Sequence, residues 1–355
     1  MTTELERPPA TLTTELIESV GAAARALDCG EQTARGNLAA LAESGVLGLG
    51  APRNSDGALP AMASVVGQLA GECMSTAFTI WAHRMTIEYL TTAGTPWAIN
   101  AAEHLRTGAV LGVTGMASAF KDAAGCGSLD LTAEPVDNGY ALSGTLRWAS
   151  NLYDDSIMVT AARAESGDKL IVALPLSSDG VKIGEHFDLL ALGSTASSYL
   201  TLDNAYIGAD QVLTCDVGSF LATVRPTFLV LQSAMCLGLA RRCIDQARLG
   251  LTGVNSVFVP EVDMLAGKLS LAESTLMALA QATGTAATPG KRQLLSLRLA
   301  AAELASSAAA LEVRTAGGKG YARQTDASRR FREAAFIPVQ SPSESQLRWE
   351  LGRCA

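Results

Sequence analysis

Histidine and cysteine, the residues that most often serve as bases, nucleophiles or metal ligands, form no recognisable catalytic group in this chain. The three histidines, His83, His104 and His186, have no serine, cysteine or acid at the spacing of a hydrolase. The seven cysteines are an odd number and include no Cys-x-x-Cys pair. We therefore expect reduced thiols and no metal site. His83 is expected to be structural, with a place in a substrate cavity as the alternative.

Two other stretches could carry chemistry. In the run Leu142-Ser143-Gly144-Thr145-Leu146-Arg147-Trp148-Ala149-Ser150-Asn151, alternation predicts a strand with one buried side that includes Leu142, Leu146 and Trp148. The run Ala316-Gly317-Gly318-Lys319-Gly320-Tyr321 is rich in glycine, which lets backbone amides approach a phosphate without a Cβ in the way. The same glycines would also serve as a cap that ends a helix.

Three zones of different periodicity must position these residues. Apolar residues recur every three or four positions up to about residue 106, which predicts helices, including one that ends at Gly45 and a buried one over about 62–93. From residue 109 the period is two, and Asn138 supplies the positive φ of a hairpin turn. The strands are expected at 110–114, 129–134, 140–148, 157–163, 170–174 and 199–202. After residue 216 helices return, over 225–249, 262–283 and 293–314.

This pattern predicts an α+β fold with several domains. We expect an N-terminal helical domain over 1–108, a central β-barrel-like antiparallel sheet domain over 109–213, and a C-terminal helical bundle over 214–355. The net charge of −8 argues against nucleic acid and anionic membranes as partners. The N-terminus lacks a basic, apolar leader and no long apolar run stands out, so a cytoplasmic protein is expected.

The motifs resemble those of the acyl-CoA dehydrogenase family, a flavoprotein superfamily that includes related flavin monooxygenases. The run from Leu142 to Asn151 is similar to the family's Leu-x-Gly-x-Lys-x-Trp-Ile-Thr-Asn strand. This resemblance implies that Trp148 packs on a flavin ring and that the hydroxyl of Ser150 bonds the ring near N5 or O4. Thr114, at a strand end similar to Leu-Thr-Glu-Pro, is implied at the pyrimidine edge of the flavin. The central domain would thus hold the flavin ring and the substrate.

The C-terminal glycine run resembles the family's Gly-Gly-x-Gly-Tyr. It implies that Gly317 and Gly318 approach the pyrophosphate of FAD, which in the family often belongs to a neighbouring subunit, so a homotetramer or homodimer is expected. The family's Arg-x-x-Phe-Gly has lost its arginine here, at Asn255, and Arg314 is proposed to restore that charge. Arg225-Pro226 looks like the family's Arg-Pro, so Arg225 is implied on the substrate side.

The catalytic base of the family is missing from its usual position. That position falls on Gln340 or Ser341, and neither side chain accepts a proton near neutral pH. Glu344 lies about three places later, either as a displaced base or as a first-turn partner of a helix dipole.

Three functions stay open from the sequence. The first is FAD-dependent α,β-dehydrogenation of an acyl-CoA or carrier-bound acyl group. The second is a flavin-dependent monooxygenase of the same superfamily, which needs no α-proton base. The third is a catalytically inactive member that completes the oligomer of an active homologue.

Overall fold

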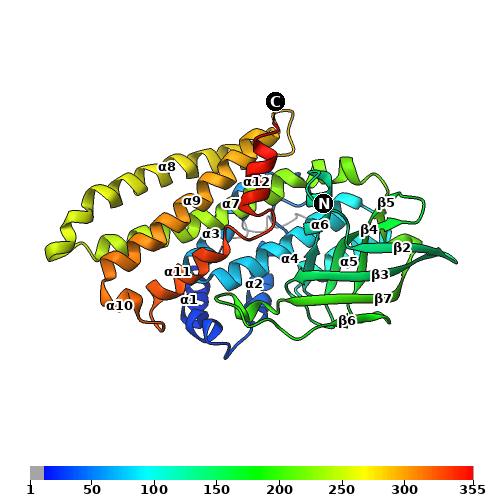
Figure 1. The fold of residues 1–355 in the computed structure, drawn as a ribbon, viewed down its shortest axis with the longest axis horizontal. Helices are drawn as coiled ribbons and strands as arrows, with labels where there is room; N and C mark the ends of the chain where they lie inside the picture. The colour runs from blue at the N-terminus through cyan, green and yellow to red at the C-terminus, as the bar shows by residue number, and fades with distance from the viewer. Residues whose placement is uncertain (1–11, 355) are drawn as a thin grey trace, which may run out of the picture.

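The computed structural model describes residues 12–354, in which a sheet forms one end of the molecule and the long helices extend away from it (Figure 1). The N-terminal region consists of α1 (Thr14–Asp28), α2 (Leu38–Glu43), α3 (Leu59–Glu72), α4 (Met74–Ala93) and α5 (Pro96–Arg106). The predicted helix stop is confirmed, because Gly45 follows α2 with φ of 75°. The single helix expected over 62–93 is wrong. Cys73, with an extended backbone, separates α3 from α4.

The sheet has eight strands and is mixed, so the antiparallel part of the fold prediction is wrong. Its strands are β1 (Gly112–Gly115), β2 (Leu131–Val136), β3 (Gly139–Ala149), β4 (Ile157–Ala164), β5 (Lys169–Pro175), β6 (Val181–Ile183), β7 (Ser198–Gly208) and β8 (Val212–Thr214). Strand β4 pairs in parallel with β1 and with β2, because α6 (Ala117–Ala123) and the β2–β3 hairpin form the crossover.

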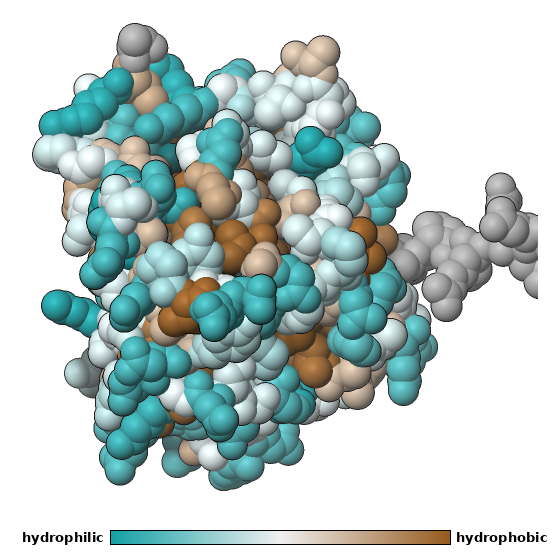
Figure 2. Space-filling view, turned by 90° about the vertical axis from the view of Figure 1, so that its right-hand side faces the viewer, coloured by the Kyte–Doolittle hydropathy of each residue, from teal (hydrophilic) through white to brown (hydrophobic). Residues whose placement is uncertain are grey.

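The barrel-like expectation is not confirmed either. Over the described residues the strands follow the order β6-β7-β3-β2-β4-β5-β8, with β1 added on β4, and no pair joins β6 to β8. The predicted hairpin turn is confirmed, since Asn138 has φ of 59° between the paired ends of β2 and β3. Figure 2 views the sheet end of the molecule and shows apolar side chains in its central recesses, with hydrophilic side chains around them.

The end of β3 departs from regular alternation. Its pairing with β7 shifts register between Leu146 and Ala149, and the extra residue turns Trp148 away from the buried side. Leu146 and Ala149 are buried, whereas 53% of the Trp148 surface is exposed. The expectation that Trp148 shares the buried side of the strand is therefore wrong, and this irregularity exposes its ring to the neighbouring cavity.

The C-terminal region is built on three long helices, α7 (Val217–Leu249), α8 (Val259–Ala282) and α9 (Lys291–Ala316). Three shorter helices follow, α10 (Gly318–Tyr321), α11 (Asp326–Phe336) and α12 (Glu344–Leu351). Helix α7 packs tightly on α3 at Gly238 and Gly67. A Cβ at Gly238 would collide with the backbone of Gly67, so glycine is what allows the two helices to approach this closely. The sequence showed no long apolar run, yet two helices, α7 and α9, are long and apolar enough to cross a membrane by length and composition alone. Their most apolar windows are 83% and 61% buried in the fold, as in the core helices of many soluble proteins.

Candidate functional site

A cavity of about 490 Å³ lies where the sheet meets both helical regions. It brings together five residues that the sequence singled out. Thr114 comes from β1, Trp148 from the end of β3, Ser150 from the residue after β3, and Gln340 and Ser341 from the segment between α11 and α12. The cavity is large enough for a drug-sized or cofactor-sized ring system.

Trp148 presents an open ring surface to this cavity. Its ring packs on one side against Phe187, with ring centroids 4.5 Å apart and an angle of 37° between the planes. More than half of its surface stays exposed. An exposed indole ring at the wall of a cavity is a surface on which another flat ring can stack.

Ser150 is buried and its hydroxyl begins a chain of hydrogen bonds. The Thr195 hydroxyl donates to the backbone oxygen of Leu192 at 2.7 Å, and its oxygen lies 2.8 Å from the Ser197 hydroxyl. Ser197 must therefore donate to Thr195, and Ser150, 2.7 Å from Ser197, must donate in turn. The proton of Ser150 is thus in use, and the hydroxyl presents a lone pair to the cavity.

Thr114 and the strand that carries it are fixed from behind by α4. The hydroxyl of Thr114 lies 3.2 Å from the hydroxyl of Tyr89. Burial raises the pKa of Tyr89. His83 accepts a hydrogen bond from the Gly112 amide at 3.0 Å, and its other ring nitrogen lies 2.9 Å from the Leu105 oxygen. Burial lowers the pKa of His83 to about 4, so the ring is neutral. His83 does not line the cavity and holds β1 against α4 and α5.

The inner wall of the cavity is aromatic. Phe78 and Trp81 from α4 stack at 5.5 Å, Phe336 from α11 meets Phe78 edge-on at 5.0 Å, and Phe228 from α7 meets Trp81 at 4.9 Å. All four line the cavity. Such a wall favours flat or bulky apolar groups and excludes water.

The charged side chains that line the cavity are all cationic. They are Lys121 and Arg332, and no aspartate or glutamate lines it within residues 12–354. Gln340 is buried, and its side-chain oxygen accepts a hydrogen bond from Arg298 at 3.2 Å. Arg298 lies behind the cavity and was missed by sequence reasoning, since one arginine in an alanine-rich helix gives no signal of its contacts.

No family model matches the chain. The curated short-chain specific acyl-CoA dehydrogenase of Bos taurus mitochondria is 24% identical over 238 residues, which are 62% of this chain and 57% of that enzyme. The match thus spans little more than half the length of this relative.

Solved structures match over almost the whole chain. A glutaryl-coenzyme A dehydrogenase bound to glutaryl-CoA superimposes with a TM-score of 0.85 at 17% identity, over 96% of this chain and 95% of that one. The chain has the acyl-CoA dehydrogenase fold. The resemblance to the acyl-CoA dehydrogenase family is confirmed for the fold. TdsC of Paenibacillus sp. A11-2, solved with FMN and indole, matches with a TM-score of 0.78 at 17% identity, over 95% of this chain and 94% of that one. A second structure describes TdsC as a dibenzothiophene monooxygenase.

Glu344 and Arg225, which the family resemblance placed on the substrate side, do not line this cavity. Glu344 opens α12, where it pairs with Arg348 at 2.7 Å one turn later, as a first-turn acid would. Arg225 on α7 pairs with Glu350 at 2.7 Å, and Lys291 reaches the same carboxylate at 2.8 Å. Burial alone would raise the pKa of Glu350, but the hydrogen bonds from Arg225 and Lys291 outweigh it and the pKa is lowered.

The residues expected at the pyrophosphate lie together at the end of α9, and none of them lines the cavity. Arg314 forms a two-pronged ion pair with Glu261, at 2.7 and 2.9 Å, and covers the ring of Phe258. Gly317 has φ of 62°, which suits a glycine that ends a helix. A Cβ at Gly318 would meet no atom within 4 Å, so internal packing does not explain this second glycine.

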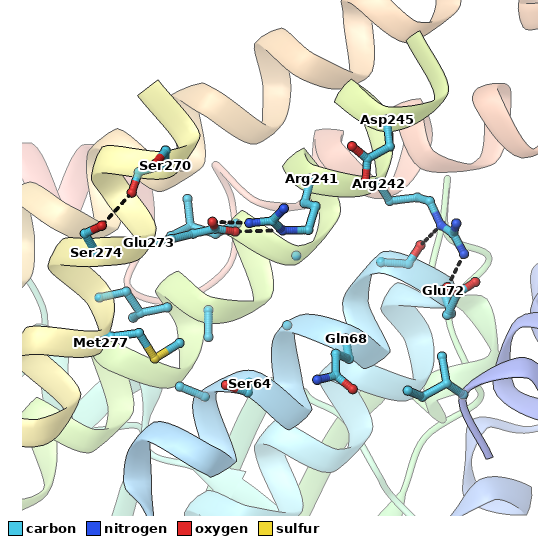
Figure 3. Close-up of a pocket in the computed structure, with 18 residues that line it drawn as sticks. Ser64, Gln68, Glu72, Arg241, Arg242, Asp245, Ser270, Glu273, Ser274 and Met277 are labelled. Carbon is cyan, nitrogen blue, oxygen red and sulfur yellow. Dashed lines mark hydrogen bonds and ion pairs between the residues drawn. The ribbon is translucent and has the colours of Figure 1, made fainter. Parts of the chain in front are cut away.

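Two further hollows carry none of the residues expected to contact the flavin. A polar one of about 470 Å³ adjoins the cavity, shares Arg332 with it and also contains Arg323 and Arg329. A larger one of about 690 Å³ lies between α3, α7 and α8 (Figure 3). Its two arginines, which are Arg241 and Arg242, are paired with Glu273 and Glu72 respectively, so its cationic charge is balanced within the hollow.

Proposed function

We propose that this protein is a flavin-dependent oxidoreductase of the monooxygenase type, in which reduced flavin and molecular oxygen oxidise a substrate held in the aromatic cavity. The observation that carries this proposal is the set of side chains at the cavity. No carboxylate lines it within the described residues, and the position of the family's base bears Gln340 and Ser341. Abstraction of an α-proton from an acyl thioester needs a base that these side chains cannot supply.

The side chains of the cavity fit a flavin ring. Trp148 offers an exposed aromatic face for stacking, and Thr114 offers a hydroxyl at a neighbouring edge. Ser150 offers a lone pair, which suits a ring N–H as its partner. By resemblance this hydroxyl faces the region of N5, a nitrogen that carries hydrogen only in reduced flavin. A bound flavin would supply a two-electron carrier that reacts with oxygen when it is reduced.

The remaining side chains serve the substrate. Phe78, Trp81, Phe228 and Phe336 would hold an apolar body against the flavin and keep bulk water out. Gln340 and Ser341 would contact the substrate from the segment before α12.

We propose FAD as the flavin and a homodimer or homotetramer as the working form. A Cβ added at Gly317 or Gly318 would meet no atom within 4 Å, which would leave their backbone open to a phosphate, but both residues lie away from the ring cavity. Under this proposal, each FAD lies between two copies of the chain. Arg314 would have to leave Glu261 to contact the phosphate. If FMN bound more tightly than FAD, this part would be refuted while the ring site would stand.

The second candidate function is α,β-dehydrogenation of an acyl-CoA or carrier-bound acyl group. It is favoured by the similarity in sequence to a short-chain specific acyl-CoA dehydrogenase. Its base would have to be Glu344, displaced from α12, or a residue of another chain.

One experiment separates these functions. The purified protein is loaded with FAD, and the flavin spectrum is followed after anaerobic addition of butyryl-CoA. We expect no bleaching by the thioester. We also expect that chemically reduced flavin on the protein is reoxidised by oxygen at a rate different from that of free reduced flavin. Bleaching by butyryl-CoA would refute the monooxygenase proposal, and a protein that takes up no flavin would refute both enzymatic functions.

A further inference from the structure

Arg298, on α9, is a fully buried cation without a partner carboxylate among the described residues. Its side chain is bound only by neutral groups. The Nε atom donates to Gln232 at 3.2 Å, Nη2 donates to the backbone oxygen of Ile337 and to Gln340, each at 3.2 Å, and Nη1 has no partner. A buried and unpaired charge is costly, so it is seldom kept without a compensating negative charge.

Gln340 connects this charge to the cavity. The side-chain oxygen of Gln340 accepts a hydrogen bond from Arg298. If the amide were flipped, its NH₂ would face the N–H donors of Arg298, so the observed orientation is the favourable one. The NH₂ of Gln340 is therefore directed away from the arginine. That NH₂ has no hydrogen-bond partner within the described part of the chain, although Gln340 is 97% buried and lines the cavity. The amide therefore presents donors that the fold leaves unsatisfied.

Two neighbours of Gln340 are unsatisfied in the same way. The hydroxyl of Ser341 and the indole N–H of Trp81 are buried and have no hydrogen-bond partner among residues 12–354, and both residues line the same cavity. The backbone of Ser341 is held by Gln232, whose amide donates to its oxygen at 2.9 Å. Buried donors normally have acceptors, and a group of them without any indicates a ligand that supplies one.

From these contacts we infer that Gln340, together with Ser341 and Trp81 and backed by the charge of Arg298, forms a subsite for a negatively polarised oxygen. The oxygen belongs to a compact ring compound, as a phenolic or enolic group whose anionic form the subsite stabilises. Its ring body lies against Phe78, Phe228 and Phe336. The role of this subsite in catalysis rests on the proposed flavin-dependent oxidation. Binding of the ring compound at the subsite does not require the flavin.

The other charged groups at the cavity are Lys121 and Arg332. Arg332 is already paired with Asp28 at 2.6 Å, whereas Lys121 is exposed and forms no ion pair with any residue in 12–354. Lys121 is therefore the alternative source of any positive potential that a bound ligand experiences, and the test must separate it from Gln340.

The test uses 2-naphthol as the probe and naphthalene as the same ring without the oxygen. We expect the pKa of bound 2-naphthol, measured by difference absorbance during a pH titration, to lie about one unit below that of the free compound. We also expect 2-naphthol to bind roughly tenfold more tightly than naphthalene.

The decisive variant is Gln340→Glu, which keeps the shape of the side chain and its contact with Arg298 but replaces the donor by a second carboxylate oxygen. It should abolish the pKa shift and the advantage of 2-naphthol, and leave the affinity for naphthalene unchanged. Gln68→Glu, the same chemical change in the hollow of Figure 3, should alter neither. Lys121→Gln should keep the shift.

The inference would be overturned if the wild type did not bind 2-naphthol or showed no pKa shift. It would also be overturned if the shift survived Gln340→Glu, or if Lys121→Gln removed it. The flavin content of the same preparations keeps this result separate from the proposed function. A shift that depends on Gln340 in a protein that takes up no flavin would support the subsite and refute the flavin function. If the protein binds flavin and the reduced flavin reacts with oxygen, but the pKa of 2-naphthol does not shift, the flavin function is supported and the subsite is refuted.

Discussion

Replacing Trp148 by alanine distinguishes a ligand platform from a core residue. Because 53% of the Trp148 surface is exposed and its one stacked neighbour is Phe187, the fold loses little packing in Trp148→Ala. A flat ring laid on the indole would cover roughly 80 Å² of it, which is about 2 kcal/mol at ~25 cal/mol per Å². That free energy corresponds to a factor of about 30 in the Kd for flavin.

The assay is a fluorescence titration of FAD into the wild type and Trp148→Ala, with a thermal melt of each protein. We expect the Kd to rise about 30-fold and Tm to change little. Trp349→Ala is the matched control, since Trp349 is 42% exposed, lies on α12 and does not line the cavity. An unchanged Kd in Trp148→Ala, or an equal rise in Trp349→Ala, would refute the reasoning.

Three further predictions concern the site and its support. Ser150→Ala should weaken the binding of reduced FAD more than that of oxidised FAD, because the lone pair that the wild type offers suits an N–H donor; equal losses in an anaerobic titration would contradict the hydroxyl chain. Burial holds the pKa of His83 at about 4 against 6.5 in the unfolded chain, so its contribution to stability is constant above about pH 6.5 and declines as pH falls towards 4. The loss of stability reaches about 3 kcal/mol at about pH 4. It is measured as the free energy of urea unfolding of wild type minus that of His83→Gln, determined at about pH 7.5 and at about pH 4. A difference between the two proteins that does not change with pH would contradict the buried, neutral His83. Glu350→Gln should destabilise the fold by about 2 kcal/mol, because Arg225 is mostly buried and loses its charged partner, with no change in flavin affinity; a wild-type urea midpoint would count against this ion pair.

The positions of six of the eight strands and of the chemistry-bearing residues could be predicted because they depend on local pattern, whereas the three-residue strands β6 and β8 are too short to show one. Alternation located β3 within one residue at each end, and Asn138 marked its turn. Thr114 and Ser150 lie in or beside two such strands, so the resemblance could assign them to one site. The structure does bring them to one cavity.

What the pattern could not predict depends on contacts between distant parts of the chain. Parallel pairing of β1 with β4 leaves no local mark, since a strand in either direction has the same alternation. The exposure of Trp148 comes from a register shift against β7, which periodicity treats as regular. The contact of Arg298 with Gln340 joins positions 42 residues apart, and each alone looks like an ordinary helix or loop residue.

The central claim is that the cavity between β1, the end of β3 and α4 holds a flavin ring. Equilibrium dialysis of the purified protein against FAD and against FMN tests it most directly, with Trp148→Ala dialysed in parallel. We predict saturable uptake of one flavin per chain by the wild type, weakened in the variant. A wild-type protein that retains neither flavin, or a variant that retains flavin as tightly as the wild type, would contradict the claim.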